Sequence, residues 1–127
     1  MNYEQQAVKK FHKTFGLPVA NKPKVLSIEA KNRRRKLMTE ELLELIDAMM
    51  IEDLTSIADG ICDLLYVVYG TAVEAGLDIK PLFTEVHRSN MTKVGGSLNE
   101  FGKWIKPETY DPPHLEPLIK KQLTTSK

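Results

Sequence analysis

Basic residues are absent from the middle of this chain. No lysine, arginine or histidine occurs in residues 37–79, although the 127-residue sequence contains 18 lysines and arginines. The formal net charge is only +1, so there is no global attraction to nucleic acids or anionic membranes. Solvated helices normally mix both signs, because opposite charges four residues apart stabilise them. The absence of basic residues from residues 37–79 therefore needs a specific explanation.

Two further absences narrow the class of protein. A single cysteine, Cys62, excludes an internal disulfide and suits a reducing compartment. The N-terminal segment MNYEQQAVKKFHKTFG lacks the apolar core of a signal peptide, and the apolar stretch LLYVVYGTAV is too short to span a bilayer. We therefore expect a cytoplasmic protein without nucleic-acid or membrane partners. Its length predicts one domain over residues 1–127.

Helix signals dominate what is present. We expect helices over residues 2–15, 27–50, 53–75 and 79–93, with Ser27 and Asp53 as N-caps and Gly76 ending the third. A long loop over residues 95–113 and a short helix over residues 114–123, capped by Asp111, complete the chain. LLYVVYG has strand-forming residues, but its flanks continue a helical spacing.

These elements predict an all-α fold: a bundle of about five helices with a four-helix core. Helices of this length cannot bury their apolar faces alone, which favours a bundle. The apolar faces are wide enough that we also expect surface to be buried between chains, in at least a dimer.

Residues 37–79, which contain no basic residue, hold ten carboxylates. Glu41 and Glu44 are three residues apart, and Asp59 and Asp63 are four apart, so each pair projects from one helical face. Asp63 stands within ICDLLYV, where almost no polar face exists. An antiparallel pair of helices would bring both pairs together. A water-facing acidic stripe remains the alternative for EELLE taken alone.

Crowded carboxylates without a basic partner are relieved by protonation or by a cation. Oxygen ligands suit Mg²⁺, with Mn²⁺ as the alternative, so Glu41, Glu44, Asp59 and Asp63 are the candidate metal ligands. A di-iron site would need Glu-x-x-His pairs, and zinc would need several Cys or His ligands. The three scattered histidines provide neither pattern.

Five stretches together resemble the all-α nucleoside triphosphate pyrophosphohydrolases, which include MazG-like and phosphoribosyl-ATP pyrophosphohydrolase-like proteins. They are VKKFHKTFGLP, EELLE, ADGICDLLYVVYG, EVHRSNMTKVG and GKWIKPETYDPP. The family's hallmark is E-x-x-E on one helix and E-x-x-D on the next. This chain departs from it at Gly60, three residues before Asp63, where the family has Glu; the nearest acid is Asp59.

The resemblance implies a hydrolase that cleaves a nucleoside triphosphate between its α- and β-phosphates, releasing a monophosphate and pyrophosphate. It implies Glu41, Glu44 and Asp63 as metal ligands, joined by Asp59. Glu40 and Glu41 are the predicted catalytic residues, with Glu40 orienting the attacking water. Simple solvent exposure is the open alternative for Glu40.

The substrate needs further contacts from the protein. Four residues are predicted to bind phosphate: Arg34, Arg88, Asn90 and Lys93. A surface role is the alternative for Arg88 and for the basic run that contains Arg34. His12 and Phe15 are predicted to hold the base, with core packing as the alternative for Phe15. Two other functions remain open at this stage: hydrolysis of phosphoribosyl-ATP, and a helical interaction module without catalysis.

Overall fold

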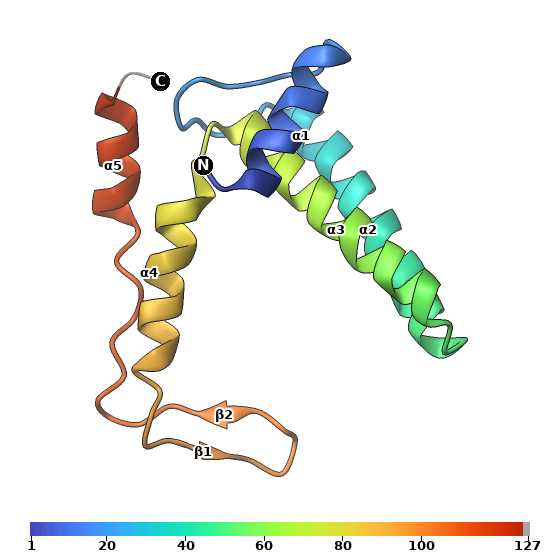
Figure 1. Ribbon diagram of the computed structural model, residues 1–127. Coiled ribbons are helices and arrows are strands. Elements are labelled where there is room, and N and C mark those ends of the chain that lie inside the picture. The colour runs from blue at the N-terminus through green and yellow to red at the C-terminus, as the bar shows by residue number, and fades with distance from the viewer. Residues whose placement is uncertain (126–127) are drawn as a thin grey trace. The chain divides into compact units, whose positions relative to one another are not determined.

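The structure is a computed structural model that describes residues 1–125. Five helices and one two-stranded antiparallel sheet make up this part of the chain (Figure 1). The elements are α1 (Tyr3–Thr14), α2 (Ile28–Met50), α3 (Leu54–Ala75), α4 (Ile79–Met91), β1 (Ser97–Leu98), β2 (Trp104–Ile105) and α5 (Glu116–Thr124). The predicted all-α class and the number of helices are confirmed, and LLYVVYG is helical.

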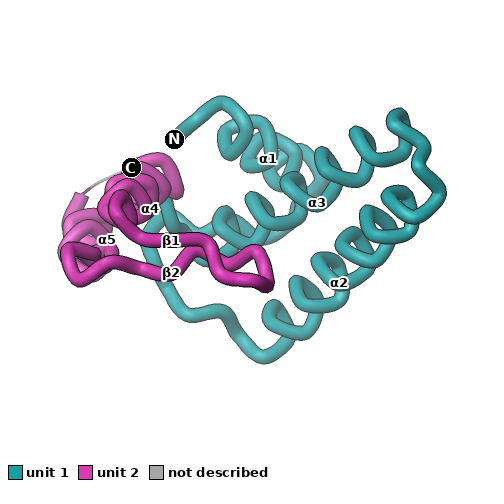
Figure 2. The backbone as a smooth tube through the Cα atoms, turned by 90° about the horizontal axis from the view of Figure 1, so that it is seen from below, with its two compact units in different colours: residues 1–78, 127 teal, residues 79–126 magenta. Residues whose placement is uncertain are grey.

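The chain divides into two compact units, coloured separately in Figure 2. The first unit, Met1–Asp78, holds α1, α2 and α3. The second, residues 79–125 of the described part, holds α4, the β1–β2 hairpin and α5. A single domain over residues 1–127 and a four-helix core stay predictions.

An antiparallel helical hairpin forms the body of the first unit, where α2 and α3 lie side by side (Figure 1). The hydroxyl of Ser27 accepts from the amide of Ala30 at 3.1 Å and caps α2, as predicted. Asp53 precedes α3 but accepts from the hydroxyl of Ser56 rather than from a backbone amide. Gly76 ends α3 in the left-handed conformation, with φ +69°, which glycine adopts without strain.

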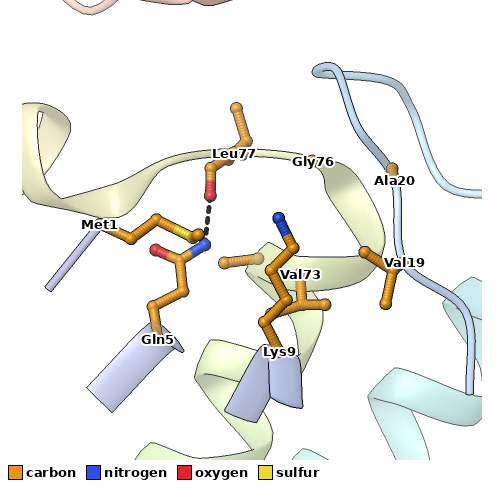
Figure 3. Close-up of a pocket in the computed structure, with 9 residues that line it drawn as sticks. Met1, Gln5, Lys9, Val19, Ala20, Val73, Gly76 and Leu77 are labelled. Atoms are coloured by element: carbon orange, nitrogen blue, oxygen red, sulfur yellow. Dashed lines mark hydrogen bonds between the residues drawn. The ribbon is translucent and has the colours of Figure 1, made fainter. Parts of the chain in front are cut away.

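Helix α1 is fixed to the C-terminal end of α3 by polar contacts. Gln5 is almost fully buried, and its side-chain amide donates to the carbonyl of Leu77 at 2.6 Å, the dashed line in Figure 3. Asn2 accepts from the Gln5 amide as the N-cap of α1 and donates to the Tyr69 hydroxyl at 2.9 Å. Because these buried groups have partners, their burial carries no unpaired polar atom.

Three expectations for the second unit are wrong. The predicted loop over residues 95–113 contains the β1–β2 hairpin, whose turn is closed by Asn99: its side-chain oxygen accepts from the amides of Phe101 and Lys103, each at 2.9 Å. The last helix begins at Glu116 rather than at residue 114. Asp111 does not cap it, because its carboxylate pairs with Arg88 and His114 instead.

Apolar side chains remain exposed on both helices of the hairpin. Met50 and Leu54, at the tip of the hairpin, are 78% and 79% exposed, and Leu43 and Leu65 are about half exposed. Helix α3, with 22 residues, is long and apolar enough by length and composition to cross a membrane, although the sequence analysis judged the apolar stretch LLYVVYGTAV too short. A helix of a soluble bundle passes the same test, and α3 also carries Asp59 and Asp63.

Candidate active site

The α2–α3 hairpin gathers three carboxylates. One oxygen each from Glu41, Glu44 and Asp63 lies within 4.8 Å of the other two. Glu41 and Glu44 share one face of α2, and Asp63 reaches them from α3. Within residues 1–125, no basic side chain forms an ion pair with any of the three. The structure therefore brings together three of the four predicted metal ligands.

Glu41 is the most constrained member of the cluster. Its Oε2 is shielded from solvent and has no hydrogen-bond partner. Burial, together with the neighbouring charges of Glu44 and Asp63, raises the pKa of Glu41 above its ordinary value of 4.5. A buried carboxylate oxygen without a donor is energetically unfavourable unless something outside the chain occupies the space in front of it. The donor set contains only oxygen atoms, which suits Mg²⁺ or Mn²⁺.

The two other predicted acids lie outside this group. Asp59 is exposed and is not among the three clustered carboxylates, so its role as a ligand stays a prediction. Glu40 is exposed beside Glu41, where its charge contributes to the raised pKa of Glu41. Its catalytic role also stays a prediction.

A cavity of about 400 Å³ opens beside the carboxylates. All of its lining comes from the first unit: Phe11, His12, Leu17, Arg34, Leu37, Glu41, Asp63, Tyr66 and Val67. Glu41 and Asp63 supply its acidic groups. Phe11 and Tyr66 supply aromatic walls, with their rings edge to face at 5.6 Å. Ligand pockets typically combine a mainly apolar lining with a few polar groups in this way.

Arg34, a predicted phosphate contact, is held by other protein groups. It is 5% exposed and pairs with the buried carboxylate of Glu74 at 3.0 Å, and Arg33 pairs with the same carboxylate. Arg34 also donates to the Val67 carbonyl at 2.7 Å and to the Thr71 hydroxyl at 3.2 Å. A buried guanidinium needs such compensation. Since Arg34 lines the cavity as well, contact with a substrate stays a prediction.

The two predicted base contacts have different surroundings. His12 is 3% exposed, lines the cavity and bonds through Nδ1 to the Pro18 carbonyl at 2.8 Å. Phe15 is largely exposed and packs against Phe11, with the ring centroids 4.5 Å apart and the ring planes tilted by 43°, but it is not part of the cavity lining. The sequence analysis missed Phe11, which lies one helical turn before Phe15 on the same face of α1 and precedes His12.

The remaining predicted phosphate contacts belong to the second unit. Arg88 pairs with Glu85 at 2.8 Å and with Asp111 at 3.0 Å, and this hydrogen bonding lowers the pKa of Glu85 to about 2. Asn90 and Lys93 line a separate cavity of about 240 Å³ with Met91, Val94 and Trp104. Contact of these residues with a substrate in the first unit stays a prediction.

Comparison with known proteins identifies the family. The sequence model of the phosphoribosyl-ATP pyrophosphohydrolase family matches residues 8–90, which include α2, α3 and every residue of the carboxylate cluster. No curated protein matches the sequence. Members of this family hydrolyse phosphoric anhydride bonds in nucleotide-like substrates and are typically metal-dependent. The chain belongs to the phosphoribosyl-ATP pyrophosphohydrolase family, within the MazG-like all-α nucleoside triphosphate pyrophosphohydrolases.

Proposed function

We propose that this protein is a Mg²⁺-dependent pyrophosphohydrolase that cleaves nucleoside triphosphates, ribo- or deoxyribo-, between the α- and β-phosphates. Water adds to phosphorus, the anhydride bond breaks, and the products are a nucleoside monophosphate and pyrophosphate. The observation that carries this proposal is the Glu41–Glu44–Asp63 cluster, with its unpartnered Glu41 oxygen. It lies beside a cavity whose lining combines aromatic side chains with a few polar groups. Mn²⁺ is the alternative ion.

Glu41, Glu44 and Asp63 would hold the metal, and Asp59 is the candidate for a further ligand. When bound, a divalent ion neutralises phosphate oxygens and acts as a Lewis acid on the anhydride. The carboxylate cluster and the triphosphate are both negatively charged and repel each other. The substrate therefore enters only together with its counterions. Glu40, exposed beside Glu41, is proposed to orient the attacking water.

Phosphoribosyl-ATP is the second candidate substrate, because the matching family bears its name. The two candidates share the same bond cleavage and the same carboxylates. They differ in the part of the molecule that is attached to the triphosphate, so an activity assay over a panel of substrates separates them.

The decisive assay incubates the protein with each common NTP and dNTP and with phosphoribosyl-ATP, with Mg²⁺ or Mn²⁺, and measures pyrophosphate and monophosphate release. Glu44→Gln and Asp63→Asn should reduce kcat/KM at least about a hundredfold, because each removes a proposed ligand. Asp47→Asn is the matched control, an exposed acid on α2 outside the cluster. Full activity in either cluster variant, or no cleavage of any of these nucleotides, would overturn the proposal and favour a non-catalytic interaction module.

We further propose that the protein is a cytoplasmic homodimer or homotetramer. Exposed apolar side chains follow both helices of the hairpin: Leu42, Leu43, Ile46, Met49 and Met50 on α2, and Leu54, Ile61 and Leu65 on α3. Burying such side chains against a second copy removes apolar surface from water at about 25 cal/mol per Å². Sedimentation equilibrium should give two or four chains per particle, and a monomer at all concentrations would contradict this assembly.

A further inference from the structure

Two lysine side chains of the second unit meet over one aromatic ring. The ammonium group of Lys106 lies 4.6 Å from the centre of the Tyr110 ring, and that of Lys93 lies 5.8 Å from it. Within residues 1–125, neither lysine forms an ion pair. The face of an aromatic ring attracts a cation, but it supplies no counter-charge. Two like charges are therefore held at one place without an anion to compensate them.

The acids of the same region do not neutralise this pair. Asp111 pairs with Arg88 at 3.0 Å, and Glu85 pairs with the same guanidinium at 2.8 Å. Glu108 is exposed and forms no ion pair in the described part of the chain. The positive charge of the two lysines is consequently open to an anion from outside the chain.

The backbone around the lysines is fixed by close contacts between the hairpin and the end of α4, which precedes it in Figure 1. Trp104 donates from Nε1 to the carbonyl of Lys93 at 2.7 Å. A Cβ on Gly96 would collide with the carbonyl of Ile105. The absence of a side chain at Gly96 thus lets the end of β2, which leads directly into Lys106, lie against the turn that follows α4.

Hydroxyl contacts fix the Tyr110 segment to the same helix. Ser89 is 1% exposed, and its hydroxyl donates to the Asp111 carbonyl at 2.7 Å and lies 3.4 Å from the Tyr110 hydroxyl. The Thr92 hydroxyl accepts from the Asp111 amide at 2.8 Å. Breaking such hydrogen bonds would leave buried polar groups unpaired, which is unfavourable. The ring is therefore held beside Lys93, the residue that follows Thr92.

Further donors stand next to the lysine pair. Asn90 and Lys93 are the polar groups of the 240 Å³ cavity at the end of α4, and Met91, Val94 and Trp104 complete its lining. Asn90 is exposed, and its side-chain amide carries two N–H donors. Lysine binds phosphate oxygens as a point charge. A single phosphate presents its charge at one centre, whereas a pyrophosphate group presents charge at two and can contact both ammonium groups.

We propose that Lys93 and Lys106 form a binding site for a pyrophosphate group, and that Tyr110 positions both ammonium groups. Lys106 and Tyr110 are additional to the phosphate contacts predicted from the sequence. The choice of ligand rests on the proposed function, which supplies this group in two forms: the tail of the triphosphate substrate and the released product. The site itself lies within residues 79–125.

Equilibrium dialysis in metal-depleted buffer tests the site apart from the carboxylate cluster, which repels anions when no metal is bound. The wild-type protein should bind pyrophosphate saturably and at least about tenfold more tightly than inorganic phosphate, because a second ammonium group is engaged. Trp104 is the only tryptophan in the sequence and lines the cavity beside Lys93, so its fluorescence should change with the same Kd. Three results would each overturn the site: no saturable binding, equal affinity for the two anions, or binding without a change in fluorescence.

Two charge-removing variants locate the ligand. Lys106→Met should weaken pyrophosphate binding at least about fivefold, because it removes one charged contact. Lys103→Met is the matched control: it removes the same charge from the hairpin, but Lys103 does not lie over the Tyr110 ring. Its Kd should stay within about twofold of the wild type, since exposed charges are screened by salt. Equal Kd values in the two variants would contradict the role of Lys106.

Two variants of Tyr110 test the positioning role. Tyr110→Leu keeps both lysines but removes the ring, and it should weaken pyrophosphate binding about threefold or more. Tyr110→Phe keeps the ring and should bind as the wild type does. Melting temperatures and gel filtration verify that both variants fold. Equal weakening in the two variants, or none in Tyr110→Leu, would contradict positioning by the ring.

ATP and AMP distinguish the two sources of the pyrophosphate group. Weaker ATP binding by Lys106→Met, with AMP binding unchanged, identifies the substrate tail as the ligand; weaker binding of pyrophosphate alone identifies the released product. Pyrophosphate binding at this site without cleavage of any nucleotide would support the site while overturning the hydrolase. Cleavage with equal kcat/KM in Lys106→Met and the wild type, together with equal pyrophosphate binding, would overturn the site and leave the hydrolase standing.

Discussion

Replacing Glu41 with Gln should stabilise the metal-free protein while weakening its response to metal. Glu41 lies within 4.8 Å of carboxylate oxygens from Glu44 and Asp63, and its shielded oxygen has no donor. Glutamine has the same shape without the charge and brings an N–H₂ group that can donate to the neighbouring carboxylates. The substitution therefore removes repulsion and adds hydrogen bonds in the same space.

The size of the effect follows from the distance. Two unit charges 4.8 Å apart repel by about 1 kcal/mol in water and by about 3 kcal/mol at an effective dielectric constant of about 20. The cluster borders solvent, so the lower part of this range applies, and we expect about 1 to 2 kcal/mol. For a chain of this length, about 4 °C in melting temperature corresponds to each kcal/mol. Glu41→Gln should accordingly melt about 4 to 8 °C higher than the wild type.

The pH dependence has a definite sign. Because the folded-state pKa of Glu41 is raised above 4.5, its contribution to stability is present below 4.5 and is lost as the pH rises through the folded value. The advantage of Glu41→Gln should therefore be full at neutral pH and disappear in acid, where the wild-type carboxyl is protonated in both states. Added salt should shrink it, since salt screens exposed charges.

The assay is thermal unfolding with excess EDTA and, separately, with Mg²⁺. Mg²⁺ should raise the melting temperature of the wild type, since a ligand specific for the folded state stabilises it, and should raise that of the variant much less. Asp47→Asn, an exposed acid on the same helix outside the cluster, should leave both values unchanged. A Glu41→Gln variant that melts at or below the wild-type temperature in EDTA would refute the account of the cluster as crowded and uncompensated.

Three other substitutions test the surrounding structure. Glu74→Gln should destabilise the protein by about 3 to 5 kcal/mol in chemical denaturation, because it leaves the buried guanidinium of Arg34 uncompensated; a loss below about 1 kcal/mol would show that the pair is dispensable. Gly60→Ala should lower stability by about 1 to 3 kcal/mol, because its Cβ would lie 3.1 Å from the Leu45 Cα; an unchanged denaturation midpoint would show that the helices separate freely. Glu85, with a pKa of about 2, contributes stability above its ordinary 4.5 that is lost as the pH falls toward 2, so Glu85→Gln should flatten the acid side of the melting profile, and an unaltered profile would contradict this.

Local rules predicted the helices well and their surroundings less well. Ser27 and Gly76 mark helix ends through their own backbone and side-chain chemistry, so sequence suffices to place them. The β1–β2 hairpin was missed because its turn depends on one side chain, Asn99, accepting from two amides within the turn. Asp111 was expected to cap α5, but Arg88, more than twenty residues earlier, is its ion-pair partner.

The sequence predicted the carboxylate cluster because charge and helical periodicity are both local. The spacing of Glu41 and Glu44, and the apolar surroundings of Asp63, required only that the two helices form a hairpin. The partners of His12 and Arg34 were not predictable in this way, since Pro18 and Glu74 reach them through tertiary packing. A basic run such as KNRRRK does not reveal which of its arginines turns inward; the structure buries Arg34 and leaves Arg35 exposed.

The close contact between α2 and α3 at Gly60 explains how Glu41, Glu44 and Asp63 come together in this chain without a glutamate at position 60. A Cβ at this position would lie 3.1 to 3.3 Å from backbone and side-chain atoms of Leu45, so the glycine lets α2 and α3 approach more closely than a larger residue allows. Leu45 follows Glu44 directly, and Asp63 is one turn beyond Gly60, so the contact lies next to the acids. A glutamate at position 60, the acid of the family pattern, would have to push the helices apart and carry Asp63 away from Glu41. Restoring that pattern by Gly60→Glu should therefore weaken metal binding rather than strengthen it, and tighter Mg²⁺ binding by this variant in calorimetry would refute the role of the close helix contact.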